Sequence, residues 1–116
     1  MKGAYFEEKA VEFLKLKGYK VIERNFRTKW GEIDIVAQDK NVVSFVEVRA
    51  RRIESSLLPK ETVDRRKREK IRVAAKLYVQ KMPNSFFRFD VVSILEADTF
   101  TLYELIKGAF DMKEYF

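Results

Sequence analysis

Apolar residues recur along the chain first with a helical period and later with the two-residue period of strands. From Tyr5 to Lys17 the apolar positions fall at helical spacing, at Phe6, Ala10, Phe13 and Leu14. Gly18 follows directly, and a glycine in that place typically ends a helix. The N-terminal part of the chain is therefore predicted to be an amphipathic helix with one buried face.

Strand-like stretches lie on both sides of a second helical pattern. We predict strands at Tyr19 to Phe26, Gly31 to Ala37, Val42 to Arg49, Phe87 to Leu95 and Thr101 to Ile106, with a turn at Asp39 to Asn41. The helix between them presents an apolar stripe of Ile71, Ala74, Ala75, Tyr78, Val79 and Met82. The predicted order is α-β-β-β-α-β-β, which indicates an α/β fold.

The start of that second helix is marked by loop and capping residues. Ser55, Ser56 and Pro59 indicate a loop after the third strand. Thr62 can then cap the helix, and Asp64 is favourable in its first turn because of the helix dipole.

Composition narrows the chemistry that the chain can support. The 116 residues fit a single domain, 1–116, and include neither cysteine nor histidine. Disulfides, thiolate or imidazole ligands and histidine acid–base catalysis are thereby excluded, so a bound metal needs oxygen ligands. The sequence has no uninterrupted apolar run of membrane length and no signal-peptide core. We therefore expect a cytoplasmic protein without a membrane partner.

Two acidic residues interrupt the apolar runs of neighbouring predicted strands. Asp34 lies within Gly31 to Val36, and Glu47 lies within Phe45 to Arg49. A buried carboxylate is costly unless it is paired, protonated or bound to a metal. Carboxylate and carbonyl oxygens suit Mg²⁺, Mn²⁺ or Ca²⁺. The pattern predicts a Mg²⁺ or Mn²⁺ site between Asp34 and Glu47.

Strand alternation adds basic neighbours to these acids and with them an alternative interpretation. Asp34 is expected to share a face with Glu32, a rim residue, while Glu47 shares one with Arg49 and Arg51. The acids and arginines could therefore form a structural ion-pair network instead of a metal site.

Positive charge is concentrated at the start of the second helix. The stretch Arg65 to Arg72 holds six basic residues and one acidic residue, in a chain whose net charge is +6. Such clustering is typical of proteins that bind the phosphate backbone, although a solvated helix face gives the same pattern. Trp30 either covers the sheet edge or stacks on an exposed base. The candidate DNA-binding residues are Arg65, Arg66, Lys67, Arg68, Lys70, Arg72 and Trp30.

Several stretches together carry a resemblance that covers nearly the whole chain. They are Gly18 to Arg27, Gly31 to Asp34, Phe45 to Val48, Ala74 to Tyr78 and Arg88 to Val92. In these stretches the chain resembles the YraN family of uncharacterised bacterial proteins, which is similar to archaeal Holliday-junction resolvases of the PD-(D/E)xK nuclease superfamily.

The resemblance implies a restriction-endonuclease-like fold, a mixed central sheet flanked by helices. It places the nuclease acids on Asp34 and Glu47 and matches Glu7 to a further acidic position, although the helix dipole alone also favours an acid there. It also implies branched or single-stranded DNA as the partner, and a homodimer, because two active sites are needed to nick symmetric strands.

One position departs from the superfamily pattern. Arg49 stands two residues after the second acid, where the pattern has lysine. Arginine does not act as a general base, but it can hold a phosphate, so we expect Arg49 to serve as an electrostatic clamp. The sequence thus favours a metal-dependent, structure-directed DNA endonuclease. The alternatives are a non-catalytic nucleic-acid-binding protein that keeps the nuclease fold and a protein-interaction module with structural acids.

Overall fold

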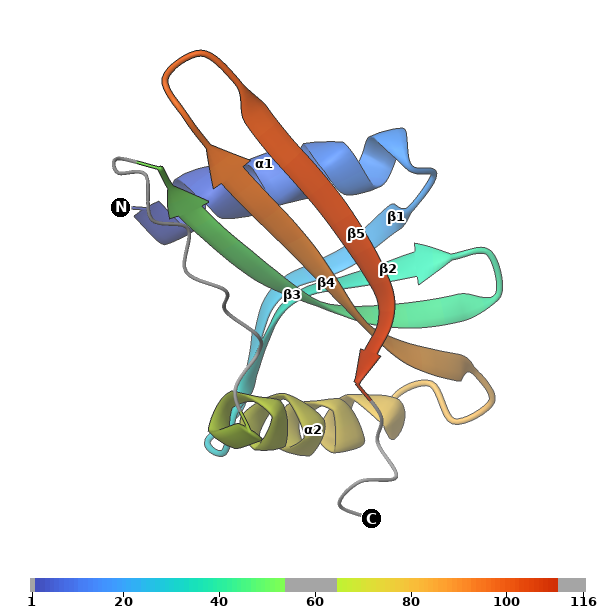
Figure 1. The fold of residues 1–116 in the computed structure, drawn as a ribbon. Coiled ribbons are helices and arrows are strands. Elements are labelled where there is room, and N and C mark those ends of the chain that lie inside the picture. The colour runs from blue at the N-terminus through green and yellow to red at the C-terminus, as the bar shows by residue number, and fades with distance from the viewer. Residues whose placement is uncertain (1, 54–64, 111–116) are drawn as a thin grey trace.

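The computed structural model in Figure 1 describes residues 2–53 and 65–110. These ranges contain the helices α1 (Lys2–Leu16) and α2 (Arg65–Val79) and the strands β1 (Lys20–Arg27), β2 (Glu32–Asp39), β3 (Val42–Arg52), β4 (Phe86–Glu96) and β5 (Thr101–Phe110). The predicted order of elements and the mixed α/β class are confirmed. The predicted loop and cap positions lie outside the described residues, namely Ser55, Ser56, Pro59, Thr62 and Asp64.

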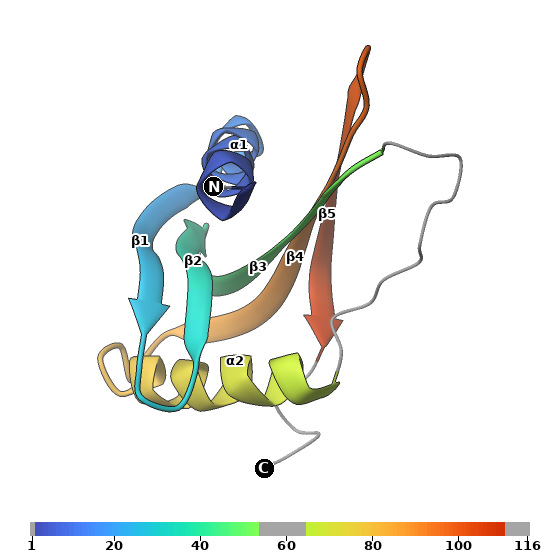
Figure 2. The ribbon, with the colours of Figure 1, turned by 90° about the vertical axis from the view of Figure 1, so that its left-hand side faces the viewer.

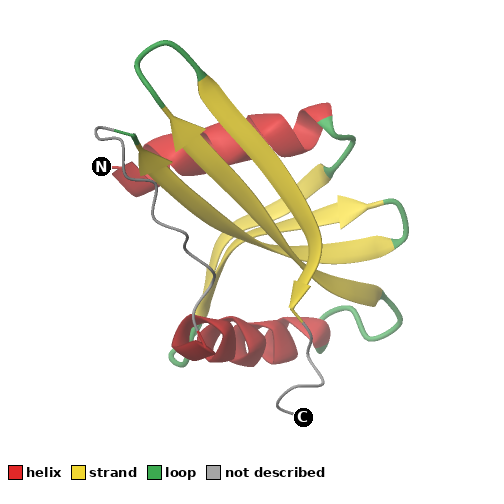
Figure 3. Cartoon of the chain, viewed as in Figure 1, coloured by secondary structure: helices red, strands yellow, loops and turns green. Residues whose placement is uncertain are grey.

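The strands form one sheet in the order β1-β2-β3-β4-β5. Neighbouring strands are antiparallel except β3 and β4, which are parallel and joined through α2 (Figure 3). β3 and β4 pair from Val42 opposite Phe86 to Arg52 opposite Glu96. β3 therefore extends beyond its predicted end at Arg49, because β4 continues to pair with its arginine-rich last residues.

The two helices cover opposite faces of the curved sheet, as Figure 2 shows, and each closes its own apolar core. On the α1 side, Phe6, Ala10, Val11 and Leu14 pack on the sheet residues Ile35, Ala37, Val46, Val92 and Ile94. On the α2 side, Ile71, Ala74, Ala75 and Tyr78 pack on Ile33, Val36, Val43, Phe45, Phe89 and Val91. In the described ranges, no helix is long and apolar enough to cross a membrane.

α1 ends just before Gly18, as the sequence predicted. The Gly18 φ angle of 90° lies in the left-handed region that glycine tolerates. The Gly18 N–H donates to the Lys15 carbonyl at 3.0 Å, and the Tyr19 N–H donates to the Leu14 carbonyl at 2.9 Å. These two hydrogen bonds form a Schellman motif, which terminates the helix and turns Tyr19 into the core.

A buried carboxylate, Asp90, ties β4 to its neighbours on the α1 side of the sheet. The Asp90 side chain is fully buried and accepts hydrogen bonds from Arg88, Tyr19, Ser44 and the Gly108 N–H. Arg88 approaches with both Nε, at 2.7 Å, and Nη2, at 2.8 Å. One ionised group thus joins four strands or strand ends through charge-assisted hydrogen bonds.

Candidate active site

Strands β2 and β3 separate beside Asp34, and the candidate site lies where they part. Their pairing runs from Asp39 opposite Val42 to Ile35 opposite Val46. Beyond this point the Asp34 carboxylate, rather than a strand backbone, accepts a hydrogen bond from the Val48 N–H at 2.9 Å. Asp34 is therefore held at the fork by the backbone of the neighbouring strand.

The regular alternation of side chains is interrupted at the same residue. Ile33 belongs to the core under α2, whereas Ile35, two residues later, belongs to the core under α1. In an uninterrupted strand these residues would share a face. Asp34 and Glu32, which we expected on one face, accordingly line different cavities.

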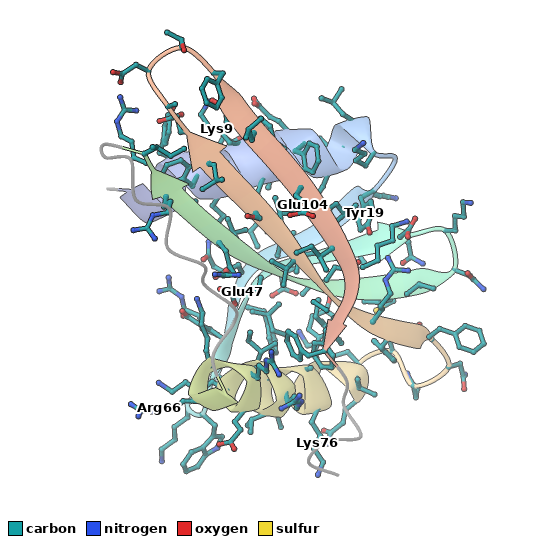
Figure 4. The ribbon with its side chains drawn as sticks, viewed as in Figure 1. Lys9, Tyr19, Glu47, Arg66, Lys76 and Glu104 are labelled. Carbon is teal, nitrogen blue, oxygen red and sulfur yellow. The ribbon has the colours of Figure 1, made fainter. Side chains whose placement is uncertain are left out.

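Glu47, on β3, is the second carboxylate at the fork. Its residue is only 4% exposed, and it projects toward the first turns of α2 (Figure 4). Burial raises the pKa of Glu47 to about 8, and the negative charge of Asp34 and a hydrogen bond with Asp34 act in the same direction. The two acids thus behave as a pair in which full ionisation requires a nearby cation.

Lys67, on α2, supplies such a cation. Its Nζ lies 2.5 Å from Glu47 Oε1, while its side chain remains 52% exposed. Burial lowers the pKa of Lys67, but the hydrogen bond to Glu47 and the Glu47 charge outweigh that effect and raise it overall. Lys67 is therefore an ammonium group at neutral pH, with one side on the acids and the other open to solvent.

The predicted third acid, Glu7, joins the same site from α1. Asp34, Glu47, Glu7 and Lys67 all line one cavity of about 460 Å³. Glu7 is positioned by β1, because the Asn25 amide donates to its Oε1 at 2.8 Å. The three acids named from the sequence thus line the same cavity. The remaining lining residues include Arg51 and Arg52 of β3.

Arg49 does not line this cavity with its neighbours on β3. It is half-buried, and its charge acts to lower the pKa of Lys67, which places the guanidinium near that ammonium. Lys67 forms an ion pair with Glu47. The sequence interpretation assigned Lys67 only to DNA binding and missed this contact. The signal was present, because Lys67 lies on the same helical face as Ile71, Ala74 and Tyr78, where a solvated lysine is not expected.

The predicted basic surface of α2 is smaller than the sequence suggested. Arg66 and Lys70 are exposed and, with Lys67, line a second cavity of about 270 Å³. Arg72 was wrongly assigned to this surface: it is 1% exposed, and its guanidinium lies 5.2 Å from the centre of the Phe110 ring. The Arg68 guanidinium also lies over the Phe110 ring, 5.7 Å from its centre. The side chain of Arg65 is outside the described residues.

The donor atoms of this site suit a hard divalent cation. Asp34 and Glu47 offer carboxylate oxygens, and their mutual repulsion is relieved when a cation binds between them. No group of three acidic side chains within residues 2–53 and 65–110 converges closely enough to hold a metal without help. Mg²⁺ is commonly bound by one or two carboxylates, with waters and substrate phosphate completing the shell, so the pair fits this mode.

Comparison with known proteins places the chain in a family. The sequence profile of the family described as "Uncharacterised protein family UPF0102" matches residues 6–94. A UPF0102 protein of Persephonella marina is 40% identical over 97% of this chain and 95% of its own length. A UPF0102 protein of Clostridium botulinum is 43% identical over 95% of this chain and 94% of its own. One from Caldicellulosiruptor saccharolyticus is 46% identical over 76% of each chain. The chain belongs to family UPF0102, which is the YraN family, as its sequence motifs indicated.

Proposed function

We propose that this protein is a metal-dependent, structure-directed DNA endonuclease. The observation that carries the proposal is the carboxylate pair Asp34 and Glu47, which lies in an open cavity beside the ammonium of Lys67. Because the cavity that the two acids line is open to solvent, a phosphodiester can reach them. The mixed sheet with a helix on each face supports the restriction-endonuclease-like architecture that the resemblance implies.

Asp34 and Glu47 would hold Mg²⁺ or Mn²⁺, and Glu7, which lines the same cavity, would orient a water molecule. When bound, the cation supplies Lewis-acid stabilisation of the phosphoryl oxygens. The Val48 N–H fixes the Asp34 carboxylate, so one ligand is preorganised before substrate arrives. Hydrolysis then adds water to phosphorus and breaks one phosphorus–oxygen ester bond.

Lys67 takes the position of an electrostatic stabiliser in this proposal. Because its pKa is raised, it remains protonated and donates a hydrogen bond to a phosphate oxygen. This assigns to Lys67 the role that the sequence interpretation gave to Arg49, and leaves Arg49 as a second positive charge near it. The superfamily lysine that is missing from β3 is thus replaced by a lysine from α2.

The alternative function is a nucleic-acid-binding protein without catalysis. Arginine at position 49 favours this alternative, because it removes the lysine of the superfamily pattern. Both functions use the exposed cations Arg66 and Lys70, and both are compatible with a cytoplasmic homodimer. They differ in whether Asp34 and Glu47 bind a metal.

Mn²⁺ calorimetry tests the proposed metal site directly. We expect Asp34→Asn and Glu47→Gln each to weaken Mn²⁺ binding at least tenfold, because each removes one anionic ligand. Glu104→Gln is the matched control: it removes the same charge from an exposed position on β5, away from the cavity, and should leave the affinity unchanged. Equal affinity in all the proteins would contradict the metal site.

A further inference from the structure

The turn between β1 and β2 is a rigid structure that carries the chain's single tryptophan. The Thr28 hydroxyl accepts hydrogen bonds from the Trp30 N–H, at 3.1 Å, and the Gly31 N–H, at 3.0 Å. The Thr28 N–H donates to the Gly31 carbonyl at 2.8 Å. The backbone at Trp30 is thus fixed from both sides by hydrogen bonds within the turn.

This turn is also docked against the backbone of α2. A Cβ atom added to Gly31 would lie 2.0 Å from the Lys70 carbonyl oxygen and 2.8 Å from the carbonyl carbon. No side chain fits between two backbones at that separation, so only glycine allows the contact. Figure 2 shows the turn passing along the helix. The position of Trp30 is therefore fixed relative to the basic half of α2.

Trp30 itself is 64% exposed and belongs to neither apolar core. The ammonium of Lys29 lies 5.2 Å from the centre of the indole ring. An exposed indole with an adjacent cation, on a rigid support, combines an aromatic stacking surface with a charge for the neighbouring phosphate. Because the backbone beneath it is already ordered, little conformational entropy is lost when a ligand stacks there.

A path of positive charge joins this turn to the candidate active site. The second cavity, between Glu32 and the helix, is lined by Arg66 and Lys70 and shares Glu47 and Lys67 with the first. Glu32 contributes an opposing charge at its edge but is paired with Arg27 at 3.4 Å. The cavity therefore continues from the acids along the cationic side of α2 toward the turn.

The separation along this path matches a few nucleotides. Trp30 precedes Asp34 by four residues, so their Cα atoms lie at most about 14 Å apart. Stacked nucleotides rise about 3.4 Å each. On this backbone scale, a base on Trp30 would lie at most about four nucleotides from a phosphate at Asp34.

We propose that Trp30 stacks on an unpaired base of a single-stranded DNA segment that continues into the active-site cavity. The inference rests on the proposed nuclease function and names its substrate class, DNA with a single-stranded segment next to the cleaved phosphate. Base pairs inside a duplex are excluded from this contact, because each is already stacked on a neighbour on both faces. Arg66 and Lys70 bind the phosphates between the stacked base and the acids.

Indole fluorescence tests the proposal without any cleavage, because the chain contains one tryptophan. In EDTA, a single-stranded oligo(dT) should quench the emission of Trp30 at saturation, whereas a long blunt-ended DNA duplex bound to the same extent should not. Absence of quenching by oligo(dT), or equal quenching by both DNAs, would overturn the stacking proposal.

Variants at Trp30 separate stacking from hydrophobic contact. Measured by anisotropy of labelled DNA, Trp30→Leu should bind oligo(dT) roughly tenfold more weakly, the loss expected for one stacked base, while Trp30→Phe stays within about threefold. Phe86→Leu is the matched control, since Phe86 is 68% exposed at the start of β4 and lies outside the path. An unchanged affinity in Trp30→Leu would also overturn the proposal.

Gly31→Ala tests the support beneath the tryptophan. It keeps every side chain of the path but forces the turn away from Lys70, so oligo(dT) binding should weaken while binding of the blunt-ended duplex is retained. If this variant fails to fold, as judged by circular dichroism, the Trp30 variants still decide the question. Quenching by oligo(dT) in a protein that never cleaves DNA would reject the nuclease function and keep the stacking site. Cleavage without quenching would keep the nuclease function and reject the stacking site.

Discussion

Replacement of Lys67 with alanine is expected to slow DNA cleavage by about 10²–10³, the usual cost of removing one preorganised stabiliser of the transition state. Lys67 Nζ forms an ion pair with the Glu47 carboxylate of the acid pair. Lys67→Arg should retain part of the rate, because it keeps the charge but replaces a compact ammonium with a planar fork. Single-turnover rates with saturating Mn²⁺ measure the effect.

Two further variants show whether the loss of cleavage rate is specific to Lys67. Lys76→Ala removes the same charge from an exposed position farther along α2, as Figure 4 shows, and should leave the rate nearly unchanged. Arg49→Ala should cost less than Lys67→Ala, because Arg49 does not line the cavity. A larger loss in Arg49→Ala would return the role of clamp to Arg49, as the sequence alone suggested.

Asp90→Ala is expected to produce the largest loss of stability, about 3–5 kcal/mol, as for other buried charge pairs that lose one partner. The substitution leaves the Arg88 guanidinium without its main counter-charge and removes the acceptor of the Ser44 and Tyr19 hydroxyls. Against a typical unfolding free energy of about 5–15 kcal/mol, this is a large fraction. Urea unfolding measures it. Asp98→Ala, whose side chain is 90% exposed and paired with Arg52, should show no measurable change.

The contribution of Asp90 should also depend on pH. Burial acts to raise its pKa, but the hydrogen bonds from Arg88, Ser44, Gly108 and Tyr19 outweigh burial and lower the pKa overall. A lowered pKa in the folded state means that the stabilisation is present above the unfolded value of about 3.9 and is lost as the pH falls through the folded value. The difference in unfolding free energy between wild type and Asp90→Asn should therefore shrink below about pH 4. A difference that grows on acidification would contradict this network.

The order of elements was predictable because its signals are local. The helical spacing before Gly18, the left-handed glycine itself and the apolar runs of the strands each depend on a few neighbouring residues. The carboxylates Asp34 and Glu47 were recognisable for the same reason, since charge within an apolar run is visible in the sequence. The structure brings them into one cavity with Glu7.

The features that the sequence did not predict depend on contacts between distant segments. The prediction that side chains alternate regularly through Asp34 was wrong, because β2 separates from β3 at that residue. The separation is set by the pairing of β2 with β1 and of β3 with β4. Arg72 was assigned to the surface because it is charged, but Phe110, from the other end of the chain, covers it. Neither the separation of the strands nor the contact between Phe110 and Arg72 can be predicted from local periodicity.

The most direct measurement of the proposed function is cleavage of a panel of DNA forms by the purified protein. Four-way junctions, flaps, single strands and blunt duplex are each incubated with Mg²⁺, Mn²⁺ or EDTA, and Asp34→Asn serves as the matched inactive protein. We expect wild type to cleave substrates that contain branched or single-stranded segments, only with a divalent metal, and Asp34→Asn to bind the same DNA without cutting it. Wild-type protein that binds these substrates yet cleaves none of them with either metal, or cleavage that persists in Asp34→Asn, would contradict the nuclease assignment.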